Sequence, residues 1–265
     1  MTPENIKCIW CKRSDRKPSI EHIIPEALGC PSEFVLKRGE VCCKCNNHLA
    51  QLDQAVIDDL DFLAYMNGIP RKRGRAPEIR SRGNVIGTYE SGQPSVFINM
   101  ESHPIMTHLG DRLGAYGRSA RNVNTAMEKI GDFAKISFGI EIGKNPKFAR
   151  GLVKIAFSSL AWYIGAGSLA HDAFNPVRRF VTKGDGFRPI ILCTDGDHSY
   201  RNQVWGPYRS PEGYYSMTFR LSSFHVWVDL SPECTSFPTI RDAMFNEYGE
   251  TGWSCLPLSA AQPRK

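Results

Sequence analysis

Residues 19–28 read SIEHIIPEAL and lie between two pairs of cysteines. The alternation in SIEHII predicts a short strand, because successive side chains of a strand point to opposite faces. Ile20, His22 and Ile24 would then share one face, and Glu21 would lie on the other. We expect His22 to be directed inward at the end of this strand, where a histidine needs a partner.

The cysteine pairs have C-x-x-C spacing and consist of Cys8 with Cys11 and Cys42 with Cys45. A tetrahedral zinc site takes four thiolates, and each C-x-x-C turn supplies two of them. The spacing therefore predicts one structural zinc ion, which would hold together a segment too short to fold on a hydrophobic core alone. The alternatives are a redox dithiol, which needs only one pair, and chance spacing. The side chain of Cys43 should point away from such a site.

The bulk composition is that of an ordinary globular protein. The chain has 265 residues, of which 42% are hydrophobic and 23% charged, and this balance excludes disordered and fibrous classes. The net charge of +6 fits an anionic partner such as nucleic acid, although many soluble proteins are equally basic. The amino terminus lacks a secretory pattern, and the crowding of cysteines near it favours metal binding in a reducing cytoplasm. Residues 152–170 predict a buried helix rather than a membrane span, because Lys154 and several small polar residues lower their apolarity.

A basic segment at residues 68–83 is the expected domain boundary. Its sequence, GIPRKRGRAPEIRSRG, has six Lys or Arg, three glycines and two prolines, a composition that disfavours helix and strand alike. It predicts a first domain at residues 1–67 and a mixed α and β domain at residues 84–265. The segment itself is either a solvated linker or a strap along a phosphate backbone.

The first domain is expected to run strand, loop, strand, helix. EFVLKRGEV reads as the second strand, and apolar residues at helical intervals then predict an amphipathic helix: Leu49, Leu52, Val56, Leu60 and Leu63. Asn46 would stand in the first turn of this helix, where it could also act as a cap.

The second domain is expected to begin with a hairpin at residues 84–100. Helices are predicted at residues 125–138 and 148–166, and strands at PIILCT, YYSMTFRL and FHVWVDL. Aromatic and basic residues interleave in the last part of the chain: Tyr200, Arg201, Trp205, Tyr208, Arg209, Tyr214 and Tyr215. They could stack against nucleotides or fill a sheet and its hairpin.

These motifs together resemble the HNH nucleases of the His-Me finger (ββα-metal) group. The resemblance rests on EHIIP at residues 21–25, where the family usually has Asp-His, apolar residues and Pro, and on CKCN at residues 43–46, which is similar to its second zinc knuckle. It covers residues 8 to about 60, under a quarter of the chain. It implies an α+β protein, with an amino-terminal zinc-bound ββα finger followed by the mixed second domain.

The resemblance also implies roles for three residues. His22 would be the general base that takes a proton from water, while Glu21 and Asn46 would bind one catalytic divalent ion. A neutral imidazole can accept a proton near physiological pH. Oxygen ligands suit Mg²⁺ or Mn²⁺, which would neutralise charge on the phosphate and stabilise the departing 3′ oxygen.

The chain departs from the family pattern at several positions. Glu21 replaces the commoner Asp, and Lys37 and Arg38 stand where the second strand usually carries an Asn. Ala50 occupies a further ligand position of many relatives, so His48 is the nearby substitute for an ion ligand. We expect nucleic acid to contact basic residues of the second strand and the linker: Lys37, Arg38, Arg71, Lys72, Arg73 and Arg75.

Two functions follow as hypotheses. The first is a metal-dependent endonuclease that hydrolyses DNA and leaves 5′-phosphate and 3′-hydroxyl ends, with the second domain as a sensor or partner-binding part, as in bacterial defence against phage. The second is a non-catalytic zinc module that binds nucleic acid or protein, in which His22 is a core histidine. We expect no membrane partner, and the oligomeric state is open, with a homodimer among the options.

Overall fold

The structure, a computed structural model, describes residues 7–70, 85–90, 93–98, 123–130, 133–140, 142–194, 200–249 and 252–256. The chain forms two compact units, one of residues 1–25, 30–57 and 143–265 and the other of residues 26–29 and 58–142. This grouping differs from the predicted boundary, because the carboxy-terminal half packs into the same unit as the amino-terminal motifs. Most of the predicted linker, residues 71–83, lies outside the described residues.

The first unit begins with the predicted order of strand, loop, strand and helix. Strands β1 (Pro18–His22) and β2 (Val35–Cys42) pair antiparallel, with His22 opposite Val35. Helix α1 (Cys43–Met66) follows β2 without a connecting loop and begins slightly earlier than predicted. Its residues up to 57 belong to the first unit and those from 58 onward to the second. Its apolar stripe is buried at Leu49, Leu52, Val56 and Leu60 and half-buried at Leu63, which confirms the amphipathic pattern.

The two faces of β1 are the reverse of the prediction. Ile20 is 55% exposed and His22 is half-buried, whereas Glu21 is only 2% exposed. The pairing register shifts between Ser19 and Glu21, and such an irregularity re-aims the side chains that follow it. The strand ends at His22, and Ile24 is buried in the bend beyond it.

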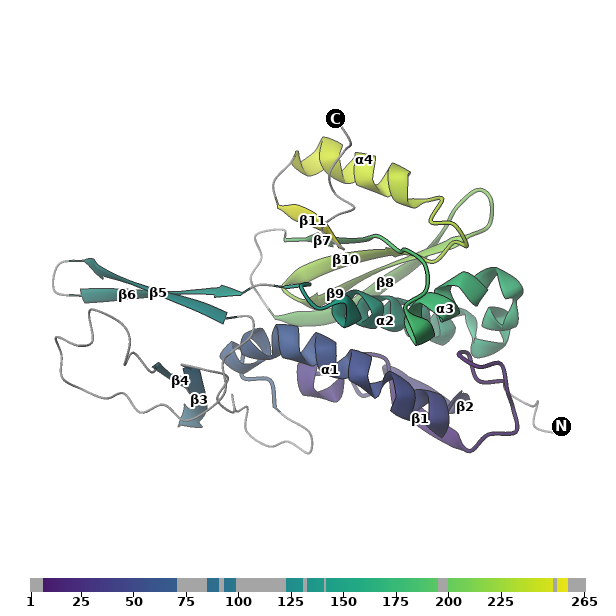
Figure 1. Ribbon diagram of the computed structural model, residues 1–265, viewed down its shortest axis with the longest axis horizontal. Helices are drawn as coiled ribbons and strands as arrows, with labels where there is room; N and C mark the ends of the chain where they lie inside the picture. The colour runs from purple at the N-terminus through teal and green to yellow at the C-terminus, as the bar shows by residue number, and fades with distance from the viewer. Residues whose placement is uncertain are drawn as a thin grey trace. The chain divides into compact units, whose positions relative to one another are not determined.

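A five-stranded antiparallel sheet forms the other part of the first unit. Its strands run in the order β11-β7-β10-β9-β8, where β7 is Ile190–Cys193, β8 Arg201–Arg209, β9 Tyr215–Ser222, β10 Phe224–Asp229 and β11 Trp253–Leu256. Helix α2 (Pro146–Ile164) covers one face and α4 (Phe237–Tyr248) covers the opposite face over β7 and β11 (Figure 1). Helix α3 (Asn175–Lys183) follows two short 3-10 helices, η4 (Ala166–Ala170) and η5 (Asp172–Phe174).

Helix α2 is the central packing element of this unit. The side chain of Asn145 accepts a hydrogen bond from the Lys147 N–H at 3.0 Å, and Pro146 occupies the first turn, so the helix start is well defined. The helix is buried from Phe148 to Ala161 except at Arg150. The predicted buried helix is therefore confirmed, and among the described residues no helix is long and apolar enough to cross a membrane.

Predictions for the middle of the chain were met in part. The expected hairpin is present as β3 (Val85–Glu90) and β4 (Gln93–Ile98). The helix predicted at residues 125–138 was wrong, because β5 (Val123–Ile130) and β6 (Phe133–Ile140) form a second hairpin there. Two residues, Gly-Asp, separate these strands, and this pair favours a two-residue hairpin turn over a continuous helix. The second unit also contains a 3-10 helix, η1 (Glu26–Leu28).

Candidate functional site

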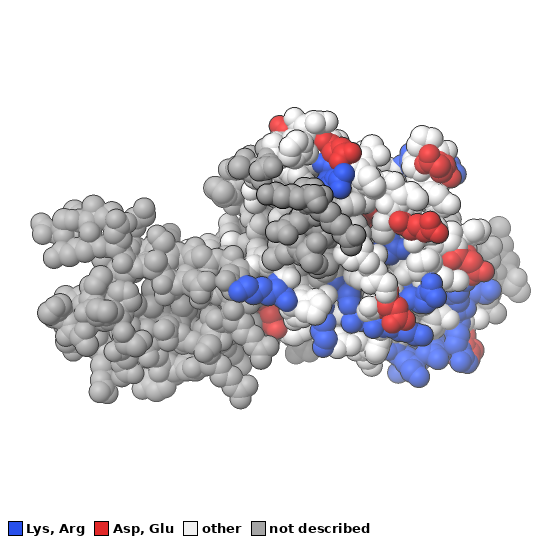
Figure 2. All heavy atoms as spheres, turned by 45° about the horizontal axis from the view of Figure 1, so that its top comes forward, with Lys and Arg blue, Asp and Glu red and all other residues white. Residues whose placement is uncertain are grey.

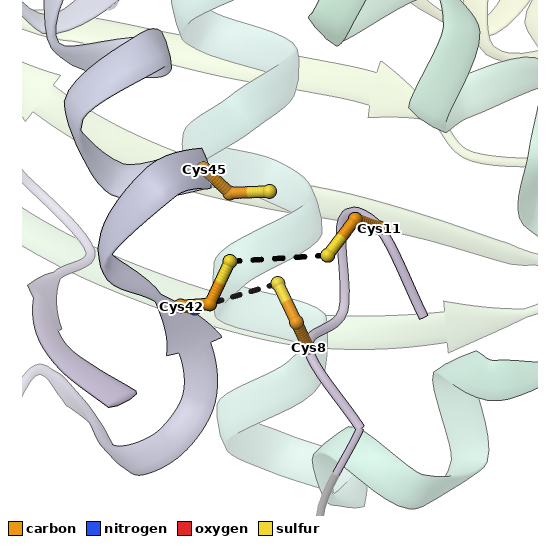
Figure 3. A group of neighbouring side chains, drawn as sticks. All are labelled: Cys8, Cys11, Cys42 and Cys45. Atoms are coloured by element: carbon orange, nitrogen blue, oxygen red, sulfur yellow. Dashed lines mark hydrogen bonds between the residues drawn. The ribbon is translucent and has the colours of Figure 1, made fainter. Parts of the chain in front are cut away.

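Four cysteine side chains converge at the base of the β1–β2 hairpin (Figure 3). Cys8 and Cys11 come from the loop before β1, Cys42 ends β2 and Cys45 lies in the first turn of α1. Their sulfur atoms all lie within 4.8 Å of one another, and those of Cys11 and Cys42 are 3.8 Å apart. Four sulfurs bound tetrahedrally to zinc at about 2.3 Å would lie about 3.8 Å apart. The four cysteines could therefore hold a metal ion such as zinc.

Backbone hydrogen bonds give the first cysteine pair its shape. The Lys12 N–H donates to the Cys8 carbonyl at 2.8 Å, and Lys12 adopts a left-handed φ of 59°, which closes the turn. The Ile9 N–H donates to the Glu40 carbonyl at 2.9 Å and so attaches the turn to β2. Cys43 donates instead to the Pro18 carbonyl at 3.3 Å and stands outside the group, as predicted.

Hydrogen bonding and burial shift the pKa values of three thiols of the group. A hydrogen bond from Cys45 lowers the pKa of Cys8 to about 4, and the same bond raises the pKa of Cys45. Burial raises the pKa of Cys11. Because metal-bound cysteines are thiolates, a bound cation would replace the thiol protons.

Asn46 joins the start of α1 to β1. Its Nδ2 donates to the Ser19 hydroxyl at 2.8 Å and to the Ile20 carbonyl at 3.0 Å. These two bonds leave Oδ1 as the Asn46 atom that could bind a cation. His22 lies two residues beyond Ile20 and is half-buried. The ββα arrangement thus brings the helix residue and the end of β1 together.

Glu21 lies on the other side of β1, in a buried ion pair with Lys154 of α2. The ammonium group of Lys154 also contacts both carboxylate oxygens of Asp53 on α1 at 2.7 Å. Burial raises the pKa of Glu21 and is opposed by Lys154. Burial alone would lower the pKa of Lys154, but Asp53 and Glu21 outweigh it and raise the pKa. The predicted role of Glu21 as an ion ligand is therefore not supported by this arrangement, because its carboxylate faces Lys154 and not the side of His22.

The other predicted site residues are dispersed. The Nε2 of His48 lies 3.1 Å from the Thr182 carbonyl of α3, so the structure does not place this ring beside Asn46 as an ion ligand. Lys37 is exposed on β2, in keeping with a contact to nucleic acid. The side chain of Arg38 lies outside the described residues, as do the linker residues Arg71, Lys72, Arg73 and Arg75.

Two buried cations that contact β1 and the first cysteine loop were missed by the sequence interpretation. One is Lys154, and the other is Arg178 of α3, whose Nε donates to the Ile9 carbonyl at 2.7 Å. The guanidinium group of Arg178 also lies 5.6 Å from the ring centre of Phe157 on α2. The position of Lys154 inside the most apolar segment of the chain was the one available indication, because a buried cation needs a partner.

Basic side chains gather at the lower right of the face shown in Figure 2. In residues 7–17 and 42–45, here called the cysteine region, the exposed basic residues are Lys7, Arg13, Lys17 and Lys44. Those of α3 are Arg179 and Lys183. The two regions are adjacent, because Lys12 forms an ion pair with Asp172 immediately before α3. This surface could attract a polyanion.

No family model, curated protein or solved structure that was compared with the chain matches it. The functional conclusion therefore rests on the geometry described above.

Proposed function

We propose that this chain is a metal-dependent endonuclease of the HNH class that hydrolyses DNA phosphodiester bonds. The observation that supports this best is the position of Asn46, which is bonded from the first turn of α1 to the Ile20 carbonyl, two residues before His22. A candidate base at the end of a strand and an amide oxygen on the following helix are what a ββα site requires.

The proposed chemistry assigns one task to each residue. A neutral His22 accepts a proton from water as that water attacks phosphorus. Asn46 Oδ1 would help to hold Mg²⁺ or Mn²⁺, which supplies charge neutralisation at the phosphate and the leaving oxygen. Glu21 would help to position His22, because its ion pair with Lys154 fixes the β1 backbone directly before His22.

We assign the four-cysteine group to structural zinc. All four protein ligands are thiolates, which is typical of closed structural sites, whereas catalytic zinc keeps a position open for water. We expect elemental analysis of the purified protein to find one zinc per chain, and Cys11→Ser to lower that content.

DNA would be held by phosphate contacts from the exposed basic residues of the cysteine region and α3. Such contacts are independent of base sequence and weaken as salt rises. The charge-reversing pair Arg179→Glu and Lys183→Glu should therefore weaken DNA binding and flatten its salt dependence.

Cleavage of supercoiled plasmid tests the proposal. With Mg²⁺ or Mn²⁺, the intact chain should nick the plasmid, and His22→Ala should slow nicking by about 10²- to 10⁴-fold, the usual contribution of a general base. His48→Ala is the matched control and should retain activity, because His48 contacts the Thr182 carbonyl. Equal nicking by the intact chain and His22→Ala would remove His22 from the mechanism.

A non-catalytic zinc module that binds nucleic acid is the second candidate. One observation favours it, namely that Glu21, the carboxylate expected at the catalytic ion, is buried against Lys154. Under this alternative, the protein would shift DNA in a binding assay but would not nick it with either ion.

A further inference from the structure

A pocket of about 670 Å³ opens where the β8–β9 hairpin approaches the start of α4. Its lining includes Tyr208, Arg209, Tyr214 and Trp227, together with hydroxyl groups of the α4 start. Tyr208, Arg209 and Tyr214 belong to the aromatic and basic segment that the sequence singled out and that the nuclease proposal does not use. The volume falls within the range of about 300–1,000 Å³ that is usual for small-molecule sites.

The local sequence directs Tyr208 into this pocket. The β8–β9 register shifts between Trp205 and Tyr208, so the β8 strand has a bulge at Gly206 and Pro207. Gly206 has a φ of 83°, and a Cβ at this position would lie 3.1 Å from the Tyr208 ring. The positive φ favours glycine here, and a side chain would also require the Tyr208 ring to shift by a few tenths of an ångström. A bulge of this kind commonly re-aims a side chain near a functional site.

Tyr208 crosses β9 to reach Trp227 on β10. Its partner residue on β9 is the small Ser216, which leaves room for the ring. The Tyr208 and Trp227 rings stack with centroids 5.4 Å apart and an interplanar angle of 24°. Tyr208 nevertheless stays 48% exposed. The pocket therefore contains an aromatic platform that is held in position by Trp227 and is open to a further planar ring.

Polar groups of both charge signs surround the platform. The guanidinium group of Arg209 lies 5.8 Å from the ring centre of Tyr215, and its Nε donates to the Gly213 carbonyl at 3.4 Å. A hydrogen bond from Ser210 lowers the pKa of Glu212, which is therefore a carboxylate at neutral pH. Arg209 can pair with a phosphate, and Glu212 can accept hydrogen bonds from an amino or hydroxyl group.

We propose that this pocket binds a nucleotide, with the base stacked on Tyr208 and the phosphate paired with Arg209. An aromatic face accepts any base, and a cation beside it selects a phosphorylated ligand over a plain aromatic one. The ligand is either a free mononucleotide or a nucleotide of single-stranded nucleic acid, because both present the same base and phosphate. This site is independent of the nuclease proposal and stands even if His22 has no catalytic role.

Isothermal titration calorimetry of the full chain tests the site, with AMP, GMP, CMP, UMP and a short single-stranded DNA as separate ligands. The buffer contains neither Mg²⁺ nor Mn²⁺, so that the DNA stays intact. At least one ligand should bind with a dissociation constant below about 1 mM. Tighter binding of a mononucleotide would identify the free nucleotide as the ligand, and tighter binding of the oligonucleotide would identify the single strand.

Three variants locate the binding. Tyr208→Ala should weaken it by about tenfold or more, whereas Tyr208→Phe, which keeps the ring, should stay within about twofold of the parent. Arg209→Gln should weaken the binding of AMP more than the binding of adenosine, which has no phosphate. This comparison still applies if Tyr208→Ala fails to fold. The proposal is overturned if neither kind of ligand shows saturable binding, or if folded Tyr208→Ala and Arg209→Gln both bind as the parent does.

Discussion

Lys154 places one positive charge inside the first unit, between carboxylates of two different elements. Its side chain is only 1% exposed and pairs with Glu21 of β1 and Asp53 of α1. Cys8, Cys11, Cys42 and Cys45 could be predicted as a group because their spacing is local to each pair. The burial of Glu21 against Lys154 could not be predicted, because it depends on a register shift in β1 and on a cation more than a hundred residues away.

We expect Lys154→Met to lower the free energy of unfolding by about 3–5 kcal/mol, because it leaves the buried Glu21 without its counter-charge. Urea denaturation measures this. Lys147→Met is the control on the same helix, since Lys147 is exposed and should change stability little. If both variants unfold at the parent's urea midpoint, the buried ion pair does not stabilise the packing of α2 against β1 and α1.

Helices α1 and α2 cross closely at Gly151. A Cβ added there would lie 2.4 Å from Val56 Cγ2 and 2.9 Å from the Leu52 carbonyl oxygen. This close contact lies three residues before Lys154 on α2. The ammonium group of Lys154 can therefore reach the carboxylates of Glu21 and Asp53. At the level of elements, α1, α2 and the hairpin of β3 and β4 followed from hydrophobic periodicity and turn residues. The β5–β6 hairpin did not, because its helix-favouring residues Met127, Glu128 and Lys129 outweighed the Gly-Asp turn in the interpretation.

Gly151→Ala should destabilise the protein by about 1–3 kcal/mol through overpacking, although Ala is the better helix former by about 1 kcal/mol. The change is measured as a lower melting temperature by circular dichroism. Gly167→Ala serves as the comparison, because a Cβ there meets nothing within 4 Å. A Gly151→Ala protein that melts above the parent would show that the helices are not in this contact.

The first unit is built from both ends of the chain. Trp10 beside the cysteine group packs on Phe157 of α2 with ring centroids 5.1 Å apart, and Arg178 of α3 bonds to Ile9. The sequence predicted the order of β1, β2 and α1 correctly. It also indicated a boundary after residue 67, because contacts between distant segments leave no local pattern. A sensor or partner-binding role for the carboxy-terminal part is a separate hypothesis, since that part also packs against the cysteine loop through Phe157 and Arg178.

A fragment of residues 1–68, supplied with zinc, should therefore not fold cooperatively. It lacks Lys154, Phe157 and Arg178, and would expose the surfaces that these residues cover. Thermal melting and the dispersion of amide proton signals in NMR spectra measure the result against the full chain. A sharp melt with well-dispersed signals would mean that residues 1–68 fold as an independent domain.

The position of a bound ion tests the central claim most directly, and anomalous diffraction from crystals soaked with Mn²⁺ would measure it. The account predicts a peak about 2.0–2.3 Å from Asn46 Oδ1, on the side of β1 that carries His22, with Glu21 still paired to Lys154. A peak bound by Glu21, or no peak beside Asn46 at saturating Mn²⁺, would contradict it.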